Sequence, residues 1–317
     1  MPPAAATHST ALLLALLPLL AAAPAPAPAA SFCDAPSSFA LEWSDEFAGP
    51  ALDAATWFAV EGTSPHPFDS TCRGDECPVF SGCREGLCLR RNAWVADGAL
   101  HLRSDNAGTW PSTFTTAAVA SRGRRNFSWA DGPFRLCVNV TLPGAVGADN
   151  RGLWPAIWML PDVPQPGACD PDGGEVDLIE MVDGNASNVP IDYWWQTAWP
   201  ARGCAAPPGP NASHLIKVLP DLGDAWAGWH EFAVESGPTW LAAAFDGAVV
   251  LNWTTQETGA PFYPTPKYLI INTALGGGWP SNPTNATQWP AVFKVDYVRL
   301  ARAIPGAAPG PDAEGAA

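Results

Sequence analysis

Basic residues are scarce in this chain of 317 residues, which has 16 Lys and Arg against 31 Asp and Glu and a formal net charge of −15. Nucleic acids and anionic membranes are bound by basic stripes that neutralise phosphate groups, so the composition argues against both as partners. The only basic cluster, "RGRRN" at residues 122–126, is interpreted as a solvated loop.

Long amphipathic helices and internal repeats are also missing. Instead, 35 Pro and 29 Gly separate short runs rich in β-branched and aromatic residues. In residues 134–142 the apolar side chains take the even positions, while Arg135, Cys137 and Asn139 take odd ones, as in a strand with two different faces. Asp246 and Gly247 form a hairpin-turn signal. These patterns predict an all-β antiparallel sandwich built on one core.

Only one long apolar run is present, at residues 11–23, and it is too short to span a bilayer. Its small-residue end predicts a signal peptide over residues 1–30, although no Lys or Arg precedes the run and a retained anchor is the alternative. The Pro/Gly-rich tail, residues 304–317, lacks the hydrophobic end of a glycolipid anchor and is expected to be disordered. We therefore expect a secreted monomer that is not held by a membrane after cleavage.

The cysteines and glycosylation sequons agree with secretion. Eight cysteines follow the signal, and the four within residues 72–88 lack the C-x-x-C spacing of a zinc knuckle, so disulfides are predicted. The pairing stays open, although Cys169 and Cys204 flank the acidic strand described next. Six N-x-Ser/Thr sequons predict N-glycosylation, at Asn126, Asn139, Asn185, Asn211, Asn252 and Asn285.

Three acids interrupt an apolar strand in "GGEVDLIEMVDG", residues 173–184. In a regular strand Glu175 and Asp177 share a face, which Ile179 should also occupy. Glu180 comes one residue late, so either it faces the other side or a β-bulge between Asp177 and Glu180 restores the alignment. Two glutamates brought together on one face suit a retaining glycosidase. A calcium site and a solvent-facing edge strand are the alternatives.

With its neighbours, this strand resembles glycoside hydrolase family 16. The resemblance rests on segments in this order: "EWSDEFAGPALDAATW", "NAWVADGALHLRS", "GPFRLCVNVTLP", "GLWPAIWMLP", "GGEVDLIEMVDG", "WHEFAVES", "YLIINTALGGGWP" and "FKVDYVRLA". It implies one domain over residues 31–303, with a Cys-rich insertion at residues 72–88. The implied fold is a jelly-roll sandwich of two curved antiparallel sheets, similar to concanavalin A, with a concave substrate cleft. The late Glu180 resembles the laminarinase-like branch.

The resemblance also implies roles for single residues. Glu175 would be the nucleophile, Asp177 the assisting carboxylate and Glu180 the general acid and base. It places four further residues at the substrate cleft: Trp154, Trp158, Asn272 and Trp279. Catalysis would need no cofactor. A structural calcium would be bound by Asp296, with carbonyl oxygens of Gly98 and Glu46.

The sequence departs from laminarinase-like members at two positions near the acids. Asp170 stands where they usually have Trp, and Trp194 or Trp195 where they tend to have His. The expected function is secreted, retaining endo-hydrolysis of a polysaccharide, with β-1,3-glucan favoured. A transglycosylase that remodels cell-wall glucan and a non-catalytic glucan-binding protein remain the alternatives.

Overall fold

The computed structural model describes residues 32–34, 38–61, 87–106, 114–145, 147–162, 174–184, 189–194, 214–219, 228–259, 262–276 and 280–306. Several residues named above lie outside this part of the chain. They are the predicted signal peptide, most of the tail, Cys72, Cys77, Cys83, Cys169, Asp170, Asn185, Trp195, Cys204, Asn211 and Trp279.

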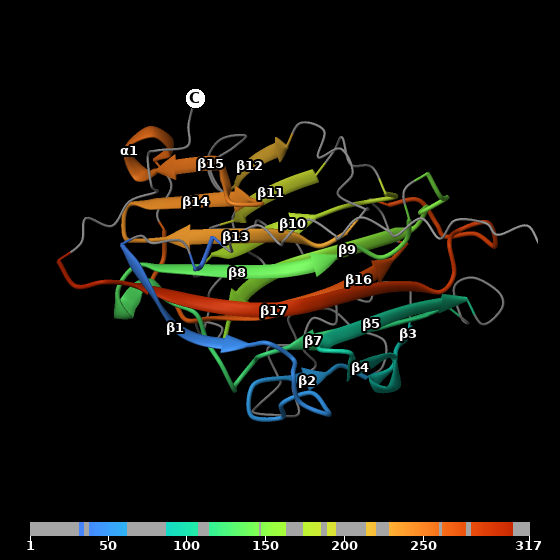
Figure 1. The fold of residues 1–317 in the computed structure, drawn as a ribbon. Helices are drawn as coiled ribbons and strands as arrows, with labels where there is room; N and C mark the ends of the chain where they lie inside the picture. Colours follow the sequence, from blue (N-terminus) through green and yellow to red (C-terminus); the bar gives the residue numbers. More distant parts are fainter. Residues whose placement is uncertain are drawn as a thin grey trace, which may run out of the picture.

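The described strands form two sheets that pack face to face (Figure 1). The larger sheet has ten strands. Its main order is β15 (Ala248–Thr254), β14 (Trp240–Phe245), β13 (His230–Ser236), β8 (Phe134–Thr141), β17 (Ala291–Ala303), β5 (Ala99–Asn106), β6 (Phe114–Thr116) and β3 (Leu87–Cys88). In addition, β1 (Phe39–Asp45) pairs with β17, and β4 (Ala93–Ala96) pairs with β5.

The smaller sheet has seven strands. Their order is β12 (His214–Leu219), β11 (Val189–Trp194), β10 (Glu175–Glu180), β9 (Leu153–Pro161), β16 (Lys267–Leu275), β7 (Ala118–Ala120) and β2 (Phe58–Ala59). Apart from the parallel pair β3 and β6, the strand pairings are antiparallel. Among the described residues, helix is limited to α1 (Thr255–Thr258) and two 3₁₀ turns, η2 (Arg90–Asn92) and η3 (Trp129–Asp131), and no helix there is long and apolar enough to cross a membrane.

The core lies between the two sheets and follows the strand alternation read from the sequence. Along β8 the even-numbered side chains, from Phe134 to Val140, enter this core with Ile157 of β9 and Ile271 of β16. The hairpin at Asp246 and Gly247 is also present: both residues have positive φ, and they connect β14 to β15. The predicted antiparallel sandwich is confirmed.

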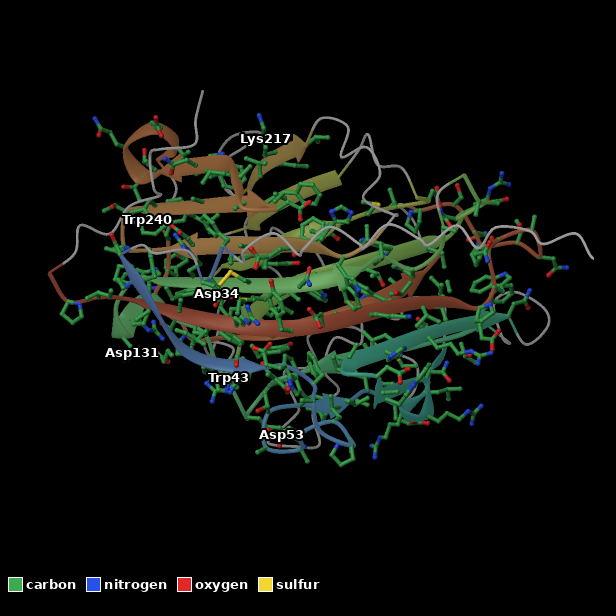
Figure 2. The ribbon with its side chains drawn as sticks, viewed as in Figure 1. Asp34, Trp43, Asp53, Asp131, Lys217 and Trp240 are labelled. Carbon is green, nitrogen blue, oxygen red and sulfur yellow. A yellow bond between two sulfur atoms is a disulfide. The ribbon has the colours of Figure 1, made fainter. Side chains whose placement is uncertain are left out.

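A short N-terminal segment, residues 32–34, covers the other face of β8. Cys33 forms a disulfide with Cys137 of β8, visible as the yellow bond in Figure 2, and Phe32 packs there in a second apolar cluster. The guanidinium of Arg135 is fully buried against the Phe32 ring. Of the odd-numbered positions of β8, predicted to be its polar face, Arg135 and Cys137 are therefore buried, while Asn139 and Thr141 are half-buried.

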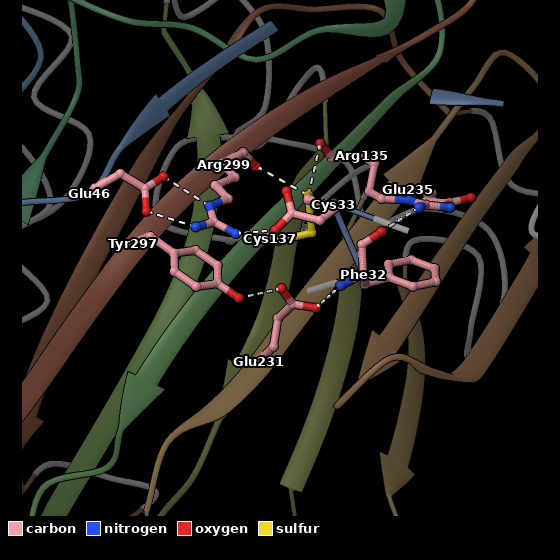
Figure 3. The surroundings of a disulfide bond; sticks show 10 residues. Phe32, Cys33, Glu46, Arg135, Cys137, Glu231, Glu235, Tyr297 and Arg299 are labelled. Atoms are coloured by element: carbon pink, nitrogen blue, oxygen red, sulfur yellow. Dashed lines mark hydrogen bonds and ion pairs between the residues drawn. A yellow bond between two sulfur atoms is a disulfide. The ribbon is translucent and has the colours of Figure 1, made fainter. Parts of the chain in front are cut away.

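Ionic contacts hold this segment in place (Figure 3). The backbone N–H of Phe32 donates to Oε1 of Glu231 at 2.7 Å, and Arg135 donates to the Phe32 carbonyl at 2.5 Å. Arg135 also pairs with Glu235 of β13. Because Arg135 and Glu235 are buried, the loss of either partner would leave an uncompensated charge.

Lys267, the first residue of β16, is a buried cation between the sheets. Its ammonium donates to the carbonyl oxygens of Tyr263 (3.2 Å) and Thr265 (3.1 Å), and it borders a small pocket lined mainly by apolar side chains. Burial lowers the pKa of Lys267 to about 7, because the charged form is poorly solvated there.

This pKa makes folding stability depend on pH. Between about pH 7 and pH 10 the unfolded chain keeps the proton that folded Lys267 has released, so the free energy of unfolding should rise with pH across this window. In Lys267→Met that part of the rise should disappear, while Lys217→Met, at an exposed position on β12, should retain it. Urea unfolding at several pH values measures the slope; equal slopes in all three proteins would contradict the prediction.

Candidate functional site

Strand β10 carries one extra residue relative to its neighbour β9. Asp177 lies opposite Trp158, but the next paired residue is Ile179, opposite Ile157, so Leu178 is inserted between the two pairs. A shift of this kind is a β-bulge, which changes the face to which the following side chains point. The irregularity predicted between Asp177 and Glu180 is therefore present.

The shift separates the apolar and acidic residues of β10. Val176, Leu178 and Ile179 all pack in the core between the sheets. Asp177 shares a face with its directly opposite partner Trp158, which belongs to a different apolar cluster on the outer side of this sheet. Glu180 accepts a hydrogen bond from Trp154, which also lies outside the main core. Together with Glu175, the three acids thus face outward from the seven-stranded sheet.

One of the acids, Asp177, belongs to a continuous row of paired residues that crosses the sheet. Starting from Asp177, the strand register leads across β9, β16 and β7 to β2 on one side, and across β11 to β12 on the other. The row reads Phe58, Ala120, Ile270, Trp158, Asp177, Asp192 and Ile216. Directly opposite residues in antiparallel strands share a face, so this row follows the outer face from edge to edge.

The two tryptophans predicted at a cleft, Trp154 and Trp158, lie beside the acids on the outer face of β9. Nε1 of Trp154 donates to Oε1 of Glu180 at 3.1 Å, and Nε1 of Trp158 donates to Oδ1 of Asn272 at 2.7 Å. Trp154 and Trp158 are only 7% and 6% exposed, and Asn272 is 2% exposed. With so little free surface, the indole rings are placed to orient polar side chains rather than to offer a broad stacking platform.

The turn after β10 connects the acidic strand to the loop before β17. The carboxylate of Asp183 accepts hydrogen bonds from the backbone N–H of Gly152 at 2.6 Å and from that of Ser281 at 3.1 and 3.0 Å. Asp183 itself has positive φ, and its own N–H donates to the Leu153 carbonyl. The segment that immediately follows residue 279 is therefore attached to the end of the acidic strand.

The residues predicted to bind calcium have other side-chain partners. Oδ2 of Asp296 accepts a hydrogen bond from Nδ2 of Asn139 at 3.0 Å, and both carboxylate oxygens of Glu46 bind Arg299. In the described part of the chain, no group of three or more His, Cys, Asp or Glu residues could hold a metal ion. Asp296 would therefore be the main charged ligand, with carbonyl oxygens such as that of Gly98, and the calcium site stays a prediction.

The described sequons differ in accessibility. Asn126, Asn252 and Asn285 are exposed, whereas Asn139 is half-buried and donates its side-chain amide to Asp296. Glycosylation remains a prediction at all of them.

Two arginines that the sequence did not indicate lie beside the outer face. Arg122 lies over the ring of Tyr268, 5.7 Å from its centroid, and Arg124 lies 5.2 Å from the centroid of Phe58. Both rings pack in or against the same apolar cluster as Trp158. The only feature of the sequence that could have indicated them was the basic cluster at residues 122–126. Its interpretation as a solvated loop did not include these contacts with aromatic rings.

No family model matches the chain, but comparisons with single proteins show clear similarity. The chain is 28% identical over 277 residues to a β-glucanase of Rhodothermus marinus, covering 83% of this chain and 85% of that protein. It is also 28% identical over 281 residues to a keratan-sulfate endo-1,4-β-galactosidase of Sphingobacterium multivorum, covering 84% of this chain but only 56% of that protein.

A solved structure supports the same relationship. The chain matches the laminarinase of Rhodothermus marinus with a TM-score of 0.63 and 25% sequence identity, covering 84% of this chain and 98% of that structure. The two-sheet jelly-roll fold is thus shared along most of the chain. Over the same length, the chain is similar to glycoside hydrolases.

The hydrogen bond between Trp154 and Glu180 predicts a measurable change in acidity. An N–H donor stabilises the ionised carboxylate, so Trp154→Phe, which keeps a ring but removes the donor, should raise the pKa of Glu180. Carbon-13 NMR of labelled glutamate side chains can follow this titration.

Trp158→Phe is the matched control, because the Trp158 indole donates to Asn272 and not to an acid. If both variants shift the Glu180 titration equally, the Trp154 contact does not set its acidity.

Proposed function

We propose that the protein is a secreted glycoside hydrolase that cleaves β-1,3-glucan internally and retains anomeric configuration. The observation that carries the proposal is the register shift in β10, which brings Glu180 to the same outer face of the seven-stranded sheet as Glu175 and Asp177. This face would form the floor of the substrate cleft. β10 has neighbouring strands on both sides, so a bound polysaccharide could extend in both directions from the acids.

The three acids can divide the chemistry between them. The Glu175 carboxylate attacks the anomeric carbon, while Glu180 donates its proton to the departing glycosidic oxygen, so that a glycosyl ester forms as the old bond breaks. Glu180 then takes a proton from water, and the resulting attack on the ester releases Glu175 and restores Glu180. Asp177 is 1% exposed, and its charge beside the glutamates would favour different protonation states for the two.

The neighbouring indoles support the role of Glu180. Trp154 donates to Glu180 and restricts its rotation, and Trp158 holds Asn272 in the adjoining strand. A general acid must reach a leaving oxygen within hydrogen-bond distance, so a fixed side chain favours the reaction. The substrate assignment follows the relatives: one is named a β-glucanase, and the similar solved structure is a laminarinase.

Secretion is supported by the disulfide between Cys33 and Cys137, since disulfides persist in oxidising compartments. Cys88 is also disulfide-bonded, as expected for the Cys-rich region if it is not a zinc site. The exposed sequons Asn126, Asn252 and Asn285 are accessible to glycosyl transfer.

The proposal predicts both substrate and stereochemistry. The purified protein should release reducing ends from laminarin faster than from lichenan, agarose or carrageenan, and proton NMR should detect the β-anomer as the first product. An α-anomer as first product would contradict retention. Binding to insoluble glucan without reducing-end release would favour the non-catalytic alternative, and longer products made from added acceptor sugars would favour a transglycosylase.

Substitution of the proposed nucleophile tests the residue assignment. Glu175→Gln should lower the hydrolysis rate roughly a thousandfold or more, because the amide cannot form the glycosyl ester. Glu257→Gln, on the exposed helix α1 in a loop of the larger sheet, is the control and should retain activity. Parental activity in Glu175→Gln would exclude the assignment.

A further inference from the structure

Two guanidinium groups border one end of the outer face. Tyr268 lies opposite Leu160 of β9. The residue before Leu160, Met159, lies opposite Val176 of the acidic strand. Tyr268 is therefore two strands from β10, or about 10 Å at the usual strand spacing. Because Arg122 lies over the Tyr268 ring, its guanidinium is near the sugars that would bind on this side of the acids.

Arg124 extends the same feature toward the sheet edge. Its guanidinium lies over Phe58, which is at the β2 end of the row that contains Asp177. The Arg124 guanidinium also donates a hydrogen bond to the Trp57 carbonyl, which restricts the position of the side chain. An aromatic face attracts a cation and leaves the outward N–H groups of the guanidinium free to bind a ligand.

Neither guanidinium forms an ion pair with an acid in the part of the chain that the structure describes. The pKa of Asp53 is lowered mainly by the backbone N–H of Ala55 and in smaller part by the charge of Arg124, so one acid lies near that guanidinium without pairing with it. Most other arginines there form ion pairs: Arg90, Arg103, Arg135, Arg151, Arg299 and Arg302. Arg122 and Arg124 make none, although acids outnumber basic residues almost two to one in the whole chain. The carboxylate of Asp162 binds the backbone N–H of Gly123 in the same turn and is not within ion-pair distance of either guanidinium.

We propose that Arg122 and Arg124 form a subsite for an anionic substituent, a sulfate or a carboxylate, on the polysaccharide bound along the outer face. The inference rests on the proposed function for the identity of the ligand as a polysaccharide. Guanidinium groups bind both anions through paired N–H donors, and such charge-assisted bonds are stronger than those to neutral hydroxyls.

The overall negative charge of the protein makes this recognition local. A chain with a net charge of −15 does not attract polyanions over a long range, so only a substituent that reaches the two guanidinium groups gains from them. The opposite end of the outer face differs: Ile216 and Val218 of β12 are 51% and 43% exposed and offer apolar surface there. The outer face thus has one end suited to anions and one suited to uncharged sugar surface.

Binding measurements in an inactive background test the subsite separately from catalysis. In the Glu175→Gln protein, isothermal titration would compare unmodified, carboxymethylated and sulfated laminarin of matched length at low salt. We expect the anionic polymers to bind about tenfold more tightly than the unmodified one, a difference that added salt reduces. The carboxymethylated and sulfated polymers identify which anion is preferred.

Variants of Arg122 then locate the effect. When Arg122→Gln is added to the Glu175→Gln protein, the Kd for the preferred anionic laminarin should approach the Kd for unmodified laminarin. Arg122→Lys should retain part of the preference because the charge remains. Lys217→Gln, an exposed position at the other end of the sheet, makes the same change in net charge and should leave the ratio unaltered. Arg124→Gln is a second test, although the bond to Trp57 gives Arg124 a structural role as well.

Two results would overturn the inference. One is equal affinity of the Glu175→Gln protein for anionic and unmodified laminarin. The other is an equal loss of preference in Arg122→Gln and Lys217→Gln, which would indicate a general charge effect. Failure of the proposed function is a separate outcome, seen when the unmutated protein cleaves no laminarin although the Glu175→Gln protein still prefers the anionic polymers.

Discussion

The extra residue in β10 is the constraint on which the candidate site depends. Strand alternation alone would direct Ile179 outward and Glu180 into the core, where an unpaired carboxylate is costly. Inserting Leu178 between two paired positions lets Leu178 and Ile179 both enter the core. The apolar residues thereby drive Glu180 to the outer face, so hydrophobic burial and the placement of the acids are consequences of the same local geometry.

The rest of the fold holds this strand from both sides. β9 and β16 pair along their whole lengths and are buried on both faces, which gives β10 a rigid neighbour. The outer side of β9 carries the indoles that orient Glu180 and Asn272. In the larger sheet, the N-terminal segment covers the side of β8 that faces away from the core between the sheets. The disulfide between Cys33 and Cys137 attaches the segment there.

Much of this could be predicted from the sequence because strand periodicity is local. The alternation in β8, the hairpin at Asp246 and Gly247, and the shift after Asp177 each follow from side-chain spacing within one strand. The partners of Trp154 and Trp158 could not be predicted in this way, since they depend on the register between neighbouring strands. The hydrogen bond from the Phe32 N–H to Glu231 joins residues nearly 200 positions apart in the chain, so no local sequence pattern predicts it.

The arginines show a different limit. A basic cluster in a turn looks the same in sequence whether its side chains extend into solvent or fold back on aromatic rings. Only the pairing of β7 with β16 and β2 brings Arg122 to Tyr268 and Arg124 to Phe58.

The central claim is that the β10 shift brings Glu180 to the outward face that already carries Glu175, where Glu175 acts as the nucleophile. It is tested most directly by trapping the glycosyl ester with a 2-deoxy-2-fluoro laminaribiosyl fluoride and mapping the labelled peptide by mass spectrometry. The account predicts one sugar adduct, attached to Glu175. Attachment to Glu180, or to a residue outside β10, would contradict it.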